Sequence, residues 1–159
     1  MRIVVWVAEG TWPACVDAAQ RLPAAETVLL HVIDPDTAGA VSGARAGLLG
    51  RGLPDGDAAS FEALTAAQSR LLDAAQERLA RPAERLARRG RPEREVVAAC
   101  GEADLLVLAR DGDRARLGPR SIGPHTRFAV DHAPCGVLLV WPDPPPGLAT
   151  LPPPPPPRH

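Results

Sequence analysis

The glycine- and arginine-rich segment between a short apolar run and the helical pattern after it is the part of the chain best suited to chemistry. Leu105 to Leu108 is a continuous apolar run, typical of a strand buried on both faces in a parallel sheet. Gly112 closely follows this run, and Gly123 precedes a segment with apolar residues at helical spacing. In a strand, glycine loop and helix of this order, backbone N–H groups at the helix start can hold a phosphate.

The basic residues of this segment are Arg110, Arg114, Arg116 and Arg120. Their guanidinium groups could form charge-assisted hydrogen bonds to phosphate oxygens, and a solvated basic turn would have the same composition. The chain has no lysine, which excludes a Walker lysine, a Schiff base and a lysine nucleophile. No catalytic triad order, carboxylate pair or metal-ligand spacing stands out, so the sequence does not indicate catalysis.

Size and composition indicate one globular domain. The chain has 159 residues, of which 45% are hydrophobic and 23% charged. The formal net charge of −1 predicts no general attraction to nucleic acid or to an anionic membrane. No apolar run is long enough to span a bilayer, and the start lacks a signal-peptide layout, which predicts a cytoplasmic protein. Cys15, Cys100 and Cys135 are widely spaced and indicate neither a disulfide framework nor a zinc site.

Apolar runs and helical patterns alternate along the chain, which predicts an α/β fold with a doubly wound parallel sheet. The expected strands cover residues 3–7, 28–33, 105–108 and 136–141, and the expected helices cover 11–22, 58–79, 92–100 and 123–132. Residues 35–57 are expected to form a long excursion with one helical turn near 46–49. Residues 83–88 have helical propensity, and periodicity alone would make them part of the preceding helix.

At several of these places the chain resembles the universal stress protein family, over residues 2–141. In the ATP-binding branch of that family, the loop after the fourth strand reads G-x2-G-x9-G-(S/T). Here it reads Ala109-x2-Gly112-x10-Gly123-Pro124, so an alanine replaces the first glycine, the spacer is one residue longer, and a proline replaces the hydroxyl residue. A proline has neither the backbone N–H nor the hydroxyl that the family uses there.

Three other segments carry the resemblance. Glu9-Gly10-Thr11 resembles the Asp-Gly-Ser that follows the family's first strand, and LLHVID at 29–34 resembles its second strand. The segment from His132 to Cys135 resembles the end of its last helix. The family register also makes residues 83–88 the third strand, because Gly90-Arg91-Pro92 resembles the Gly-x-Pro that starts its third helix.

The resemblance implies a five-stranded sheet of order 3-2-1-4-5, with a ligand site between strands one and four. It implies an adenine nucleotide, ATP with or without Mg²⁺, and pairing of two copies through the last strand, Gly136 to Trp141. Ligand sites of doubly wound sheets also lie where the strand order reverses. The candidate binding residues are Ala8, Glu9, Gly10, Thr11, Val32, Ala109, Gly112, Gly123, Pro124, His125 and Thr126.

The sequence therefore predicts a universal stress domain over residues 1–142 and a proline-rich disordered segment over 143–159. The proline-rich segment is either an inert solvated end or a ligand for a proline-recognition domain. The predicted function is a regulatory protein that binds an adenine nucleotide without efficient turnover. Two alternatives remain open: a homodimeric scaffold that does not use nucleotide, and a slow ATP hydrolase. His31 is predicted to be a satisfied core residue and His132 to close its helix.

Overall fold

The computed structural model describes residues 1–23, 26–37 and 56–158, and it contains one five-stranded parallel sheet of order β3-β2-β1-β4-β5. This order confirms the predicted fold class. The strands are β1 (Arg2–Trp6), β2 (Glu26–Ile33), β3 (Glu84–Arg89), β4 (Leu105–Ala109) and β5 (Gly136–Val140). The helices are α1 (Trp12–Gln20), α3 (Gly56–Leu79), α4 (Pro92–Ala99) and α5 (Pro124–His132), and the short 3₁₀ helices are η1 (Pro119–Ser121) and η2 (Leu148–Thr150).

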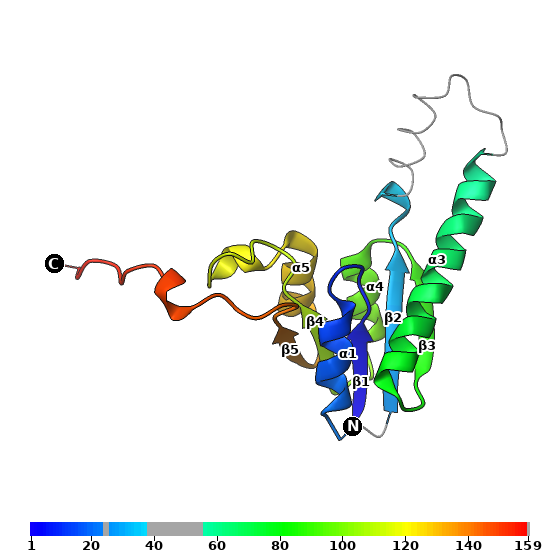
Figure 1. Ribbon diagram of the computed structural model, residues 1–159, viewed down its shortest axis with the longest axis horizontal. Helices are drawn as coiled ribbons and strands as arrows, with labels where there is room; N and C mark the ends of the chain where they lie inside the picture. Colours follow the sequence, from blue (N-terminus) through cyan, green and yellow to red (C-terminus); the bar gives the residue numbers. More distant parts are fainter. Residues whose placement is uncertain (24–25, 38–55, 159) are drawn as a thin grey trace.

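The central strands are apolar at nearly every position because both faces of the sheet are covered. Ile3 and Val5 of β1 belong to one core cluster, and Val4 and Trp6 belong to the other. Figure 1 shows the helices on the two sides of the sheet. Helices α1 and α3 pack in the first cluster, and α4 and α5 pack in the second. The sheet thus presents the carboxyl ends of β1, β2 and β4 at one edge.

The outer strand β3 settles the ambiguity at residues 83–88 in favour of a strand. It pairs in parallel with β2, with Leu86 opposite Leu30. Only Leu86 is partly buried in this strand, and the other five side chains are exposed. Strand β3 lies at the edge of the described sheet and pairs only with β2, so most of its side chains are polar and exposed. Pairing with β2, rather than local propensity, makes this segment a strand.

Most element boundaries agree with the sequence analysis to within a residue or two. Pro13 lies in the first turn of α1, yet Thr11 at the N-cap position makes no side-chain capping bond. The last strand ends at Val140, so Trp141 is not part of it. On α4 only Val96 and Ala99 pack in the core cluster, whereas Val97 does not. The turn expected near 46–49 lies outside the described residues.

The chain after β5 runs away from the sheet and past the loop between β4 and α5 (Figure 1). It contains the 3₁₀ helix η2, whose residue Thr150 accepts a hydrogen bond from Leu117 of that loop (N···Oγ1 3.1 Å). Pro142 and Pro146 are partly buried, and the other prolines of this segment are exposed. Within the described residues, no helix combines the length and the apolar character needed to cross a membrane.

Candidate functional site

A cavity of about 700 Å³ opens at the carboxyl edge of the sheet. Its floor comes from the ends of β1 and β2, one wall comes from α3, and the opposite rim comes from the starts of α4 and α5 and the residues after β4. This is the edge at which doubly wound sheets place ligands. The size is within the usual range for sites that bind small organic molecules.

Strands β1 and β2 separate at the floor of the cavity. The Val7 N–H still donates to the Leu30 carbonyl at 2.7 Å, and beyond that bond no backbone hydrogen bond joins the two segments in the described part of the chain. Alternate residues of a strand direct their peptide groups to opposite sides. The peptide groups of Val32 therefore point to the same side as those of Leu30, past the end of β1 and toward the cavity that Val32 lines.

Apolar side chains form the walls beside this free backbone. Trp6 is 9% exposed and lines the cavity at the end of β1. Ala63, Leu64 and Ala67 face it from α3. Two short alanine side chains leave space next to the helix, so a flat ring could lie against α3 while its edge meets the Val32 peptide groups. The arrangement suits a heteroaromatic base, which needs apolar faces and a few polar atoms at the edge.

Gln68 is the polar group that fixes this wall in place. Its side chain is only 6% exposed. Its amide nitrogen lies 3.1 Å from the carbonyl oxygens of His31 and Arg88, and 3.0 Å from Nδ1 of His31. A buried amide with several partners ties α3 to β2 and β3. The amide nitrogen has two hydrogens, which it shares among these three neighbouring atoms.

His31 is half-buried and lines the cavity, so it is more than a core residue. Burial lowers the pKa of its imidazole from the ordinary value of 6.5, and the nearby Glu9 carboxylate opposes part of that change. The ring is therefore neutral at pH 7. It offers a ligand a hydrogen bond and no positive charge.

The rim opposite α3 is held by hydrogen bonds between separate elements. Nδ1 of His125, at the start of α5, lies 2.8 Å from the Glu93 carboxylate at the start of α4. Burial favours the neutral form of Glu93, but its own backbone N–H, His125 and Arg91 outweigh that effect and lower the pKa of the carboxyl. His125 and Asp111 line the cavity on this side.

The loop between β4 and α5 folds back on itself. The N–H of Gly112 donates to the Ser121 carbonyl at 2.9 Å, and the N–H of Asp113 donates to the Arg120 carbonyl at 2.8 Å. The Gly123 N–H donates to the Asp111 carboxylate at 2.7 Å. These bonds close residues 111–123 into a compact unit in which the N–H groups of both glycines already have acceptors.

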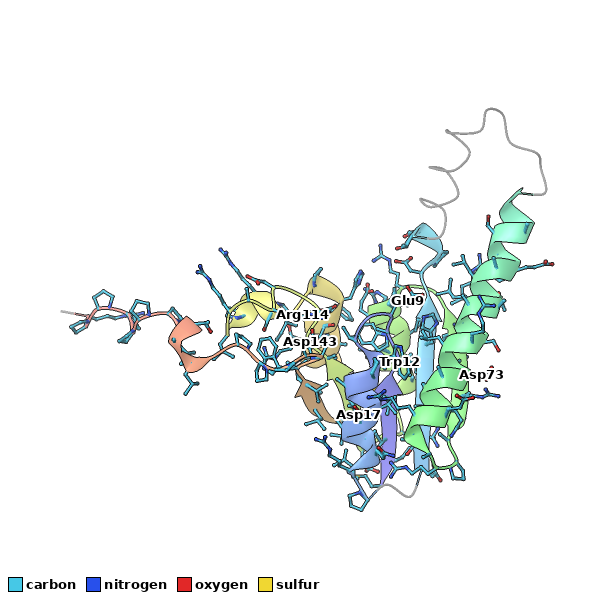
Figure 2. The ribbon with its side chains drawn as sticks, in the orientation of Figure 1. Glu9, Trp12, Asp17, Asp73, Arg114 and Asp143 are labelled. Carbon is cyan, nitrogen blue, oxygen red and sulfur yellow. The ribbon has the colours of Figure 1, made fainter. Side chains whose placement is uncertain are left out.

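Two arginines near this loop have partners outside the cavity. Arg110 donates to Ser121 Oγ and lies over the Trp141 ring at 4.6 Å, and Arg114 pairs with Asp143 at 2.8 Å. Figure 2 shows Arg114 and Asp143 together beside the segment after β5, whereas Glu9 lies on the other side, toward β2. Neither these two arginines nor Arg116 and Arg120 are among the described cavity-lining residues.

Of the sequence-predicted site residues, Ala8, Glu9, Val32 and His125 line the cavity together. Gly10 (φ +79°) and Thr11 form the turn after β1, and Ala109 is buried as the last residue of β4. Pro124 begins α5, and Thr126, 2% exposed, packs beneath it. Gly112 and Gly123 belong to the closed loop. These seven do not line the cavity.

The sequence analysis missed Trp6, Asp34, Gln68 and Asp111, which do line it. One signal was available for Gln68. It lies four residues after Leu64 and four before Leu72 on the apolar stripe of its helix, where a polar side chain must be buried and bonded. Asp111 stands in the loop that the glycine pattern defines, but only the folded loop shows that its carboxylate turns toward the helix start.

The family model for the universal stress protein family matches residues 7–140. That range includes strands β2 to β5 and every described cavity-lining residue except Trp6, and it begins just after β1. The chain belongs to the universal stress protein family. A comparison with curated proteins gives no match.

Several solved structures share the fold of this universal stress protein. The hypothetical protein MJ0577 is 17% identical, with a TM-score of 0.64 over 88% of this chain and 94% of its own. Universal stress protein UspA from Lactobacillus plantarum is 23% identical, with a TM-score of 0.57 over 88% and 97%. A universal stress protein in complex with cAMP is 19% identical, with a TM-score of 0.59 over 90% and 98%.

Proposed function

We propose that this universal stress protein is a regulatory protein that binds an adenine nucleotide in the cavity at the carboxyl edge of its sheet, without turning it over. The observation that carries the proposal is the pair of free Val32 peptide groups at the floor, beside the apolar surface of Trp6 and α3. A backbone donor and acceptor on the same residue can recognise the edge of a purine. The same-fold protein in complex with cAMP supports an adenine ligand.

The two ends of a nucleotide fit this structure differently. The base has an apolar slot and backbone partners, and the ribose would lie near Glu9 and Asp34, whose carboxylates can accept hydrogen bonds from hydroxyls. The polyphosphate end fits less well. The Gly112 and Gly123 N–H groups already have acceptors, and Pro124 has no backbone N–H to donate. The residues present thus match a nucleoside more closely than a triphosphate with Mg²⁺.

The alternative is a scaffold that retains the fold without using a nucleotide, and the self-contained loop at residues 111–123 favours it.

The apolar edge strand β5 bears on both candidates. Val137, Leu138, Leu139 and Val140 are all only partly buried, although their partners in β4 are almost entirely buried. An unpaired apolar edge is an aggregation hazard. We therefore propose that two copies pair through β5, as the family resemblance implies.

Calorimetric titration with ATP, AMP and adenosine, with guanosine and cytidine as base controls, tests the proposed function. We expect saturable binding of the adenine compounds and a rise in Tm, because a ligand that binds only the native state stabilises it. Ala67→Phe should abolish binding by filling the slot, since Ala67 lines the cavity. The matched control is Ala66→Phe, an exposed position on the same helix. Absence of binding by every adenine compound at millimolar concentration would leave the scaffold as the function.

A further inference from the structure

The chain places a carboxylate of its own where a phosphate would need to bind. Asp111 Oδ1 accepts the Gly123 N–H at 2.7 Å, at the N-cap of α5, and Asp111 also lines the cavity. A Cβ on Gly123 would stand 2.9 Å from the same oxygen, so the carboxylate is packed against the helix start. The positive end of a helix stabilises an anion, and here that anion is Asp111.

Several other backbone donors of the loop have acceptors as well. Gly112 and Asp113 donate across the loop to residues 121 and 120. Ser121 and Ile122 donate within η1, and Leu117 donates to Thr150 of the segment after β5. A phosphate that approached this loop would have to replace these acceptors one by one. Each replacement exchanges one hydrogen bond for another, so it contributes little net binding free energy.

The charge of the cavity adds to this effect. The described lining residues include the acids Glu9, Asp34 and Asp111 and no arginine. Its two histidines do not offset them, since His31 has a lowered pKa and His125 is paired with Glu93. A triphosphate carries several negative charges into this surrounding, whereas a nucleoside carries none. Like charges at short range disfavour binding.

We propose that Asp111 acts as a built-in phosphate mimic, so that the cavity binds adenosine or an adenine nucleotide with few phosphates in preference to ATP. The inference rests on the proposed function, because it assigns a ligand class to the same cavity. Affinity should fall in the order adenosine, AMP, ATP. Asp111 then lowers the affinity for ATP and leaves the affinity for adenosine unchanged. Replacing this one residue should therefore raise the affinity for ATP alone.

Titrations of the full chain with adenosine, AMP and ATP, with and without Mg²⁺, test the proposal on the natural protein and on variants. Asp111→Asn keeps an oxygen acceptor for the Gly123 N–H and removes the charge, and Asp111→Ala removes both. We expect Asp111→Ala to tighten ATP binding about tenfold, as expected for one freed hydrogen bond to a charged group. Adenosine binding should change less than about twofold, and Asp111→Asn should have an intermediate effect.

Asp113→Asn is the matched control. It is an exposed acid of the same loop that does not line the cavity, and its carboxylate caps the Ala115 N–H. It should leave the ratio of ATP to adenosine affinity unchanged. Thermal melts of each variant verify folding, and Asp111→Asn keeps the test valid if Asp111→Ala melts early.

The outcomes separate this inference from the proposed function. ATP that binds the natural protein more tightly than adenosine would overturn the inference and leave the function standing. The same holds if neither Asp111 variant changes the ratio of the two affinities. No binding of any adenine compound would overturn both.

Discussion

The Asp111 carboxylate and the Gly123 backbone N–H are joined by a 2.7 Å hydrogen bond that links the end of β4 to the start of α5. The residues are twelve apart in sequence, so this bond closes the entire glycine loop. Gly123, the N-cap of α5, has no side chain, and the Asp111 carboxylate binds the backbone N–H of Gly123 itself. The bond therefore stabilises the loop itself. A ligand can accept the Gly123 N–H only if it displaces the Asp111 carboxylate.

The close approach at Gly112 predicts that this loop does not tolerate a methyl group there. A Cβ at Gly112 would stand 2.3 Å from the Arg120 carbonyl oxygen, and backbone cannot move aside as a flexible side chain can. We expect Gly112→Ala to destabilise the protein by about 1–3 kcal/mol, the usual cost of overpacking. That corresponds to a fall in Tm of several degrees. Gly147→Ala is the control, because a Cβ there meets no atom within 4 Å; equal melting of the two variants would contradict the loop geometry.

The lowered pKa of His31 predicts that the free energy of unfolding falls as the solution becomes acidic. Its pKa is lowered in the folded protein, so between the ordinary value of 6.5 and the folded value the unfolded chain binds the extra proton. The contribution is fully present above pH 6.5 and is lost as the pH falls toward the folded pKa, with a slope of at most about 1.4 kcal/mol per pH unit. His31→Asn should flatten this part of the profile in urea melts at pH 7.5 to 5. An unchanged profile would show that the histidine is not desolvated.

Pairing through β5 predicts a dimer of about twice the chain mass by light scattering. Leu139→Pro removes a ladder N–H and should give a monomer, because proline cannot donate to a pairing strand. Leu151→Pro is the control, since Leu151 is 54% exposed and lies beyond the sheet. Leu139 also pairs with β4, so the far-ultraviolet spectrum must show that the variant remains folded. A monomer in the natural protein at tens of micromolar contradicts the pairing.

Truncation after Pro142 tests the predicted boundary of the proline-rich segment. The truncation removes the Arg114–Asp143 pair and the bond from Leu117 to Thr150. Exposed ion pairs contribute about 0–1 kcal/mol, and a single hydrogen bond contributes about 1 kcal/mol. We therefore expect Tm to change by at most a few degrees, with the dimer mass unchanged. A larger fall in differential scanning calorimetry would mean that residues after 142 belong to the domain.

The sequence predicts the fold well because the buried strands carry their own signal. Runs such as the one at Leu105 to Leu108 are apolar at every position, which only a sheet covered on both faces requires. Strand β3 has no such signal, since five of its six side chains are exposed, and the family register was needed to identify it. Pairing with β2 decides its conformation, and pairing is not a local property.

The candidate site was predictable only where residues stand at strand ends. Ala8, Glu9 and Val32 directly follow or end β1 and β2, so the topology alone brings them to one edge. The wall from α3 was not predicted, because it depends on how that helix lies across the edge. The direction of Asp111 and of the loop arginines depends on hydrogen bonds within the folded loop, and glycine spacing does not contain that information.

The most direct test of the account is a ¹⁵N NMR titration of the protein with adenosine. We expect saturable shifts at the Val32 amide, the Trp6 indole and the Gln68 side-chain amide, because these groups line the cavity. The indoles of Trp12 and Trp141 should not move, because they are not among its described lining residues. Shifts confined to other parts of the chain, or no shifts at millimolar adenosine, would contradict the claim that this cavity is an adenine site.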